Sequence, residues 1–164
     1  MTRAVLPDQD RILILDYGSQ YTQLIARSIR ELGVYCEIFA PEIDADEINA
    51  FAPSGVVLSG GPASVHDQDT PTIPEEIFGR GCPVLGICYG MQALASHLGG
   101  EVETAEEREY GPAPLTLTSQ SVLLEGLEQI TNGVDDPLQV WMSHGDRVSV
   151  LPQGFVTIAT SFLL

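Results

Sequence analysis

Four short apolar runs alternate with stretches of helical periodicity between residues 11 and 97, and this order restricts the fold more than any other feature. The runs are RILILD, VYCEIF, GVVLS and PVLGI. Each is short enough for a single strand, and GVVLS is apolar almost throughout, as are strands that helices cover on both faces. Strands that alternate with helices pair into parallel sheets with helices on both sides. We therefore expect an α/β fold with a doubly wound, mostly parallel sheet.

The segments between the runs carry helix patterns. In YTQLIARSIREL, apolar residues recur at helical spacing, and Gly33 follows as a stop signal. DADEINAF begins with acidic residues, which stabilise a helix N-terminus. We expect further helices around PEEIF and from about Met91 onward. Beyond Gly100, APLTLTS and FVTIATS alternate apolar and polar residues, which predicts antiparallel additions to the parallel core.

Composition sets the class of protein and excludes some partners. With 164 residues, of which 44% are hydrophobic and 18% charged, the chain can bury one core, so we expect one domain over residues 1–164. Phosphates would repel the net charge of -16, which argues against nucleic acid and anionic membranes as partners. The segment MTRAVLPDQD lacks the apolar core of a signal peptide, and no run reaches the roughly 20 apolar residues of a membrane span. We expect a cytoplasmic protein.

The cysteines show no C-x-x-C spacing, so we expect neither a disulfide framework nor a metal site. Cys36 lies in an apolar alternation and Cys82 at the start of a strand, and both are interpreted as small core residues. Cys88 differs, because Gly86, Cys88 and Gly90 form G-x-C-x-G at a strand-to-helix turn. This is the nucleophile-elbow pattern with cysteine in place of serine, and its glycines permit a close backbone approach. On the motif alone, a buried cysteine in a glycine-rich turn is an equal alternative.

The segment LSGGP, at the carboxyl end of the third run, adds to the interpretation of Cys88. Gly60 and Gly61 can present main-chain N–H groups beside the neighbouring elbow. One donor from this loop and one from Tyr89, the residue after the cysteine, would form an oxyanion hole. By itself, GGP is an ordinary turn. Together, the two segments predict a thiol that attacks a carbonyl group.

Five segments carry a family resemblance that extends over nearly the whole chain: ILILDYGSQYTQLIAR, GVVLSGGPASV, PVLGICYGMQALASHLGG, EREYG and VWMSHGDRV. The sequence resembles the class I (triad-type) glutamine amidotransferases, and DYGSQYTQLIAR and WMSHGD are typical of their GMP synthase branch. The resemblance implies a flavodoxin-like fold. It also implies that Cys88 attacks the side-chain amide of glutamine and forms a thioester, and that a synthetase uses the released ammonia to convert XMP to GMP in purine biosynthesis.

Carried over residue by residue, the resemblance implies roles for seven more positions. The main-chain amides of Gly61 and Tyr89 would stabilise the oxyanion. The glutamine-binding residues would be Gln92, Ser143, His144, Gly145 and Asp146. We expect Gln92 in the first turn of the helix after the cysteine, and SHGD at the carboxyl end of the strand LQVWM. A turn or capping role for SHGD is the alternative.

The chain departs from the family pattern at the general base. In this family a histidine and its carboxylate come from an H-x-E motif, usually H-P-E, and the sequence contains none. We therefore expect a domain that is incomplete at its C-terminus and inactive by itself. His66 is interpreted as solvent-facing, and His97 as either satisfied by a partner within the fold or solvent-facing. A role for His144 as a substitute base is the alternative.

The resemblance also implies partners. The synthetase (ATP pyrophosphatase) domain or subunit is not in the sequence, and ATP and Mg²⁺ would belong to it, so no cofactor is expected in this domain. A full-length relative is expected to be a homodimer. Two other functions stay open: a non-catalytic module that binds glutamine or the synthetase, and the glutaminase component of another amidotransferase, such as anthranilate synthase. DYGSQYTQ and WMSHGD argue against the second.

Overall fold

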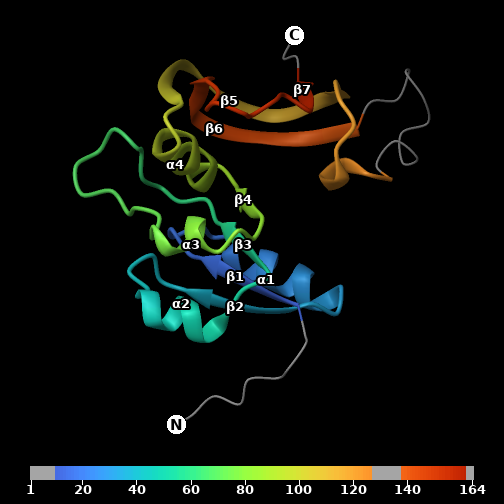
Figure 1. The fold of residues 1–164 in the computed structure, drawn as a ribbon. Coiled ribbons are helices and arrows are strands. Elements are labelled where there is room, and N and C mark those ends of the chain that lie inside the picture. Colours follow the sequence, from blue (N-terminus) through green and yellow to red (C-terminus); the bar gives the residue numbers. More distant parts are fainter. Residues whose placement is uncertain (1–9, 127–137, 162–164) are drawn as a thin grey trace.

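The computed structural model describes residues 10–126 and 138–161, and it describes residues 105–110 and 142–145 by their main chain only. In chain order the elements are β1 (Arg11–Leu15), α1 (Thr22–Glu31), β2 (Tyr35–Phe39), α2 (Ala45–Phe51), β3 (Gly55–Leu58), α3 (Glu76–Gly79), β4 (Val84–Gly86), α4 (Tyr89–His97), β5 (Glu101–Leu117), the 3₁₀ turn η1 (Val122–Leu124), β6 (Leu138–Val150) and β7 (Ala159–Ser161). The strands form two sheets (Figure 1). One is parallel, with the order β2-β1-β3-β4, and the other is antiparallel, with the order β6-β5-β7.

The parallel sheet carries helices on both faces because side chains of β1 alternate between two cores. Leu13 and Leu15 are fully buried in a cluster with residues of α2, α3 and α4. Ile14, between them, is fully buried in a second cluster with Ala26 of α1. This arrangement confirms the predicted α/β class and the doubly wound parallel sheet.

Hydrogen bonds at helix starts explain two of the turns between strands. The Asp44 side chain accepts a 2.8 Å hydrogen bond from the Glu47 amide and so caps the N-terminus of α2. After β1, the Asp16 carboxylate accepts hydrogen bonds from the Gly18 amide at 3.0 Å and from the Thr22 hydroxyl at 2.7 Å. This second pair of bonds holds the loop at the carboxyl end of β1 against the start of α1.

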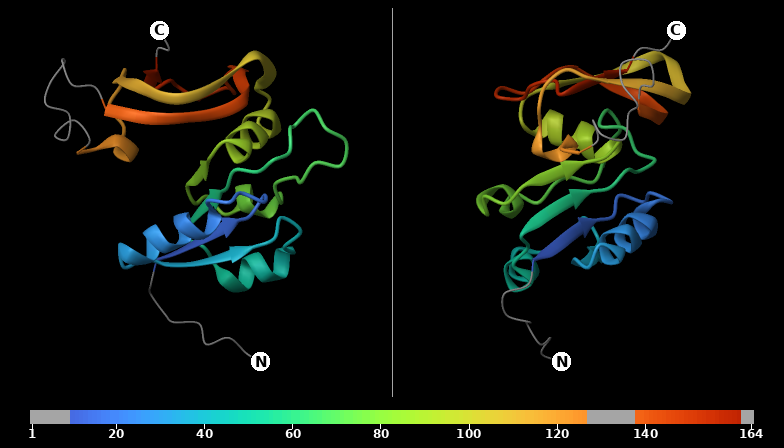
Figure 2. Two further views of the ribbon diagram at one scale, coloured as in Figure 1. Left: turned by 180° about the vertical axis from the view of Figure 1, so that it is seen from behind. Right: turned by 90° about the vertical axis from the view of Figure 1, so that its right-hand side faces the viewer.

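The antiparallel strands form a sheet of their own, and α4 lies between the two sheets in the views of Figures 1 and 2. The predicted antiparallel additions are confirmed, but their extents were wrong. β5 begins directly after α4 and runs through the acidic segment, and of FVTIATS only Ala159–Ser161 is strand. β5 and β6 pair over most of their length, and this main-chain pairing stabilises polar segments as strands. The alternation of apolar and polar residues in the sequence does not predict those segments as strands.

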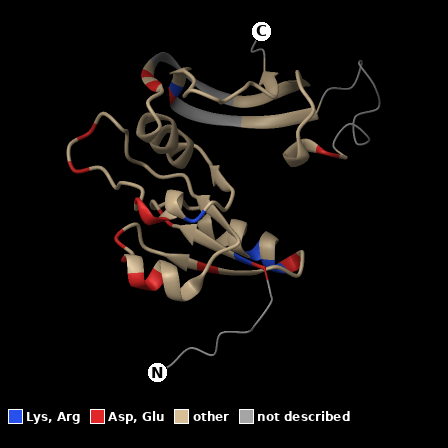
Figure 3. Cartoon of the chain, viewed as in Figure 1, with Lys and Arg blue, Asp and Glu red and all other residues tan. Residues whose placement is uncertain are grey.

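Charged residues are distributed unevenly along the described part of the chain (Figure 3). Carboxylates gather on α2 and on the loop after β3, whereas β3, β4 and α4 contain no Asp, Glu, Lys or Arg. The part of the sheet that carries the elbow is therefore uncharged. Within the described ranges, no helix combines the length and the apolar character that crossing a membrane requires.

Candidate active site

The turn between β4 and α4 has a strained backbone at Cys88. This residue caps the nine-residue helix α4 with φ 48° and ψ -113°, and its side chain is exposed. Positive φ at a non-glycine residue costs about 1–3 kcal/mol and persists only where surrounding structure enforces it. The thiol therefore stands at a helix N-terminus, where the helix dipole favours negative charge.

The two flanking glycines are required by close packing. A Cβ added to Gly86 would lie 2.6 Å from the Cα of Met91, and one added to Gly90 would lie 2.6 Å from the Cβ of Leu58. Both separations are shorter than any ordinary carbon–carbon contact. The contact between Gly86 and Met91 lets the start of α4 pack on the end of β4. The contact between Gly90 and Leu58 lets α4 pack on the end of β3.

The loop after β3 lies directly beside this turn. The Ile87 amide donates to the Leu58 carbonyl at 2.9 Å, and the Gly90 amide donates to the Ser59 carbonyl at 3.0 Å. A Cβ added to Gly60 would lie 3.4 Å from the Cβ of the cysteine, which is van der Waals contact. The two segments that sequence analysis predicted to cooperate are therefore adjacent, at the carboxyl ends of neighbouring parallel strands.

The main-chain amides of Gly61 and Tyr89 have no acceptor among the described residues. Among the hydrogen bonds of the described residues, none uses the N–H of Gly61 or of Tyr89. Tyr89 is the first residue of α4, and the first N–H groups of a helix lack intrahelical partners. The Gly90 amide, next along the chain, is engaged with Ser59. The amides of Gly61 and Tyr89 are therefore among the main-chain donors available at this junction.

Sequence analysis missed Ser59, which organises the loop from inside the protein. Its hydroxyl is fully buried, accepts a 3.0 Å hydrogen bond from the Tyr17 amide and donates at 2.8 Å to the Gly60 carbonyl. This ties the loop after β1 to the loop after β3. The sequence around Ser59 did not predict its hydrogen bond with Tyr17, because the two residues are 42 positions apart.

Tyr17 and Tyr89 form an edge-on aromatic pair beneath the loop after β3, with ring centroids 5.1 Å apart. The Tyr17 hydroxyl donates to the Thr72 carbonyl at 3.5 Å, and the Tyr89 hydroxyl donates to the Pro71 carbonyl at 2.6 Å. Burial raises the pKa of both phenols, and for Tyr89 a hydrogen bond with Thr70 partly opposes that shift. Both rings therefore anchor the loop in their neutral form.

Gln92 lies in the first turn of α4, as predicted, and is 5% exposed. Its side-chain Nε2 donates a 3.1 Å hydrogen bond to the main-chain carbonyl of Asp146. The Asp146 carboxylate in turn accepts a 2.7 Å hydrogen bond from the Ser64 hydroxyl. Asp146 therefore joins α4 and the loop after β3 to the second sheet.

The prediction that SHGD follows the end of a strand was wrong. β6 continues through these residues to Val150, and Asp146 pairs with Thr104 of β5. The main chain of Ser143 and His144 pairs with β5 as well, whereas the side chains from Ser143 to Gly145 lie outside the described residues. The pairing with β5 extends the strand, so the turn propensities of serine, glycine and aspartate do not decide its end.

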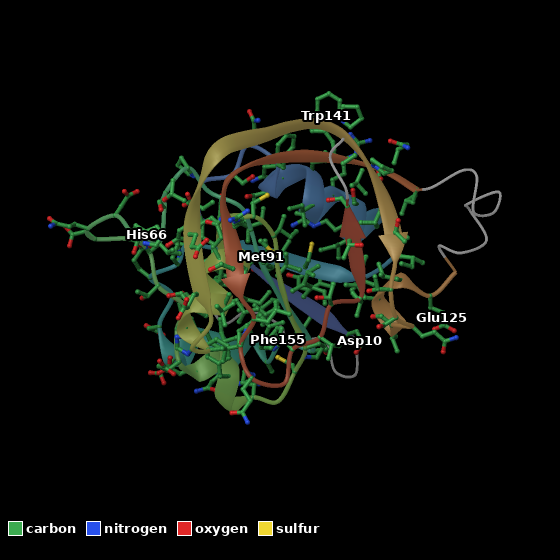
Figure 4. The ribbon with its side chains drawn as sticks, turned by 90° about the horizontal axis from the view of Figure 1, so that it is seen from above. Asp10, His66, Met91, Glu125, Trp141 and Phe155 are labelled. Atoms are coloured by element: carbon green, nitrogen blue, oxygen red, sulfur yellow. The ribbon has the colours of Figure 1, made fainter. Side chains whose placement is uncertain are left out.

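The other cysteines and histidines whose side chains are described lie apart from the elbow. Cys36 is 1% exposed in the second core cluster, and Cys82 is half-buried against the first. His97 stacks on Phe78 with ring centroids 4.4 Å apart. Figure 4 shows His66 on an outlying loop, well separated from Met91, which follows the elbow. No group of three or more potential metal ligands occurs among the side chains described.

Comparison with known proteins identifies the family of this chain. A family model described as class-I glutamine amidotransferase matches residues 13–162, so the chain belongs to the class-I glutamine amidotransferase family. Among curated relatives, the glutamine-hydrolysing GMP synthase of Idiomarina loihiensis is 53% identical over 160 residues, and that of Cronobacter sakazakii is 51% identical over 152 residues. The alignments cover 97% and 92% of the chain but only 30% and 29% of the relatives. The predicted resemblance is thereby confirmed, and the chain spans less than a third of these relatives' length.

Solved structures show the same fold. A putative GMP synthase component from Thermoplasma acidophilum matches with a TM-score of 0.71 and 28% identity, over 93% of this chain and 73% of its own. A glutamine amidotransferase from Thermotoga maritima matches with a TM-score of 0.64 and 24% identity, over 93% of this chain and 67% of its own, and supports the fold alone.

Proposed function

We propose that this chain is the glutaminase part of a GMP synthase and releases ammonia from glutamine through a thioester on Cys88. The observation that carries the proposal is the adjacency of an exposed, strained cysteine at a helix N-terminus and two main-chain amides without acceptors. Family membership and the names of the relatives support the same reaction.

The chemistry follows from these groups. The Cys88 sulfur attacks the side-chain carbonyl carbon of glutamine, and the amides of Gly61 and Tyr89 stabilise the negative oxygen of the tetrahedral intermediate. The carbon–nitrogen bond breaks, and ammonia leaves after taking up a proton. Water then cleaves the thioester to glutamate and restores the thiol, so one glutamine and one water yield one glutamate and one ammonia.

Proton transfer to ammonia and activation of water require an acid–base group. None of the three histidines in the sequence lies in an H-x-E motif. We therefore assign no general base to these 164 residues and expect the chain by itself to turn glutamine over at close to the background rate. The same sequence observation favours, as a second candidate, a module that binds glutamine without hydrolysing it.

The ammonia would pass to a synthetase portion that aminates XMP with ATP and Mg²⁺. This assignment rests on what the relatives are named, because the aligned segment covers only 29% and 30% of their length. No residue of the chain is assigned to ATP or Mg²⁺.

Labelling with a diazoketone analogue of glutamine tests the proposal. We expect saturable labelling of Cys88, protection by glutamine but not by alanine, which lacks the side-chain amide, and no label in Cys88→Ala. Equal labelling of Cys36, Cys82 and Cys88 without saturation would refute the glutamine site.

A further inference from the structure

A hydrogen bond between distant segments borders the proposed site. The Ser64 hydroxyl donates to Oδ2 of Asp146 at 2.7 Å, although the two residues are 82 positions apart. Ser64 belongs to the loop after β3 and Asp146 to β6. Hydrogen bonds to a carboxylate are short and stronger than those between neutral groups, so this one can hold the carboxylate in a set orientation.

The direction of the Ser64 hydroxyl is determined by its own turn. The Ser64 amide donates to Oδ2 of Asp67 at 2.9 Å, and the Asp67 amide donates back to the Ser64 carbonyl at 3.1 Å. The His66 amide donates to the Ser64 hydroxyl oxygen at 3.3 Å. Because that oxygen already accepts a hydrogen bond from His66, its own hydrogen is left for Asp146.

Asp146 is connected to the nucleophile through Gln92. Its main-chain carbonyl accepts the Gln92 side-chain amide at 3.1 Å, and the Gln92 main-chain amide bonds the Cys88 carbonyl at 3.1 Å. Gln92 is thus about one helical turn, roughly 5.4 Å, from Cys88. In an extended glutamine the side-chain carbonyl carbon and the α-nitrogen are about 5 Å apart by standard bond lengths.

The elements that carry the elbow give Asp146 no counter-charge. β3, β4 and α4 contain no charged residue, so they supply no competing charge. Arg147 follows Asp146 but belongs to the opposite face of the strand, where its Nη2 lies 3.5 Å from Glu103. The carboxylate of Asp146 is therefore not neutralised by its neighbour in the strand.

We propose that Ser64 is a positioning residue for substrate: its hydroxyl orients the Asp146 carboxylate toward the α-ammonium group of a glutamine whose amide carbonyl lies at Cys88. The inference rests on the proposed function and adds the residue pair that selects an α-amino acid over a simple amide. If the bond serves only to hold the second sheet in place, its loss should affect every ligand of the site equally.

The test compares two electrophiles that differ only in the α-amino group. Cys88 of the 164-residue chain is labelled with the diazoketone analogue of glutamine, with the same diazoketone lacking its α-amino group, and with iodoacetamide. The variants are Ser64→Ala and Ser64→Thr, with Ser54→Ala as the matched control. Ser54 also bears a hydrogen-bonded hydroxyl, but it lies at the amino end of β3, away from the elbow.

We expect Ser64→Ala to slow labelling by the amino-acid diazoketone about tenfold, the effect of a hydrogen bond to a charged group. Labelling by the deaminated diazoketone and by iodoacetamide should not change, and Ser64→Thr should retain most of the selectivity. Circular dichroism establishes that the variants are folded. An equal effect of Ser64→Ala on both diazoketones, or no effect on either, would overturn the inference and leave the proposed function standing. Failure of the unsubstituted chain to show saturable labelling would instead refute the proposed function, and the inference with it.

Discussion

Gly61 faces the main-chain carbonyl of Tyr17 so closely that a Cβ at Gly61 would overlap the carbonyl oxygen and lie 3.0 Å from the Tyr17 Cβ. The backbone of Tyr17 is itself held by the buried hydroxyl of Ser59. The loop after β1 therefore packs directly against Gly61, and Tyr17 cannot move away from Gly61 without straining its hydrogen bond to Ser59.

The first prediction follows from that contact. Gly61→Ala should lower the free energy of unfolding by about 1–3 kcal/mol, because the added methyl forces backbone to shift. It should also slow labelling of Cys88 by the glutamine diazoketone. Gly79→Ala is the matched control: its Cβ meets nothing within 4 Å, and we expect unchanged or slightly higher stability. Urea denaturation measures both, and equal stability of the two variants would contradict the packing argument.

Cysteine reactivity gives a second prediction. Cys88 is exposed at a helix N-terminus, whereas Cys36 is 1% exposed and its thiol bonds the Ala26 carbonyl at 3.3 Å. Limited alkylation should label Cys88 at least about tenfold faster than Cys36 or Cys82. Peptide mapping by mass spectrometry identifies the labelled residue. First labelling at Cys82 would argue against the elbow.

The third prediction concerns alkaline pH. Burial raises the pKa of Tyr17 above its ordinary value of 10.0, so unfolding at high pH releases a proton that the folded state retains. The stability from its neutral hydroxyl is fully present below about pH 10 and is lost as the pH rises above that value. Tyr17→Phe keeps the ring and removes the ionisation.

The free energy of unfolding should therefore decrease between about pH 10 and 11 in both proteins. The decrease should be smaller in Tyr17→Phe than in the parent, by up to about 1 kcal/mol. Urea titrations at several pH values measure the difference, and the same comparison at pH 7 is the internal control. Parallel curves for the two proteins at all pH values would show that the Tyr17 hydroxyl is not coupled to folding.

The fourth prediction concerns turnover. General acid–base help is worth about 10² to 10⁴ in rate, and no residue of the chain is assigned to it. Ammonia release from glutamine by these 164 residues should stay near background, although Cys88 is alkylated by the diazoketone. Fusing the chain to a segment with the H-x-E motif from a relative should restore hydrolysis. Rapid turnover by the chain alone would direct attention to His144, and His144→Ala would then abolish it.

The sequence predicted the parallel core of the fold and the turn around Cys88, because both depend on local patterns. The buried strand β3, for example, is an uninterrupted apolar run, and the helix α1 has one apolar face that ends at a glycine. Gly86, Cys88 and Gly90 were predictable for a similar reason: a tight strand-to-helix turn needs glycine wherever backbones approach too closely for a Cβ.

Only the tertiary structure decided how β5 and β6 extend and which side chains support the site. Polar segments such as SHGD become strand because a partner strand satisfies their main-chain groups, and no local pattern identifies that partner. The hydroxyl of Ser59 meets the Tyr17 amide, and the hydroxyl of Ser64 meets Asp146, across 42 and 82 residues. A serine in a loop has the same local appearance whether it faces solvent or a distant carboxylate. The folded chain alone brings such partners together, because burial and sheet packing set their positions.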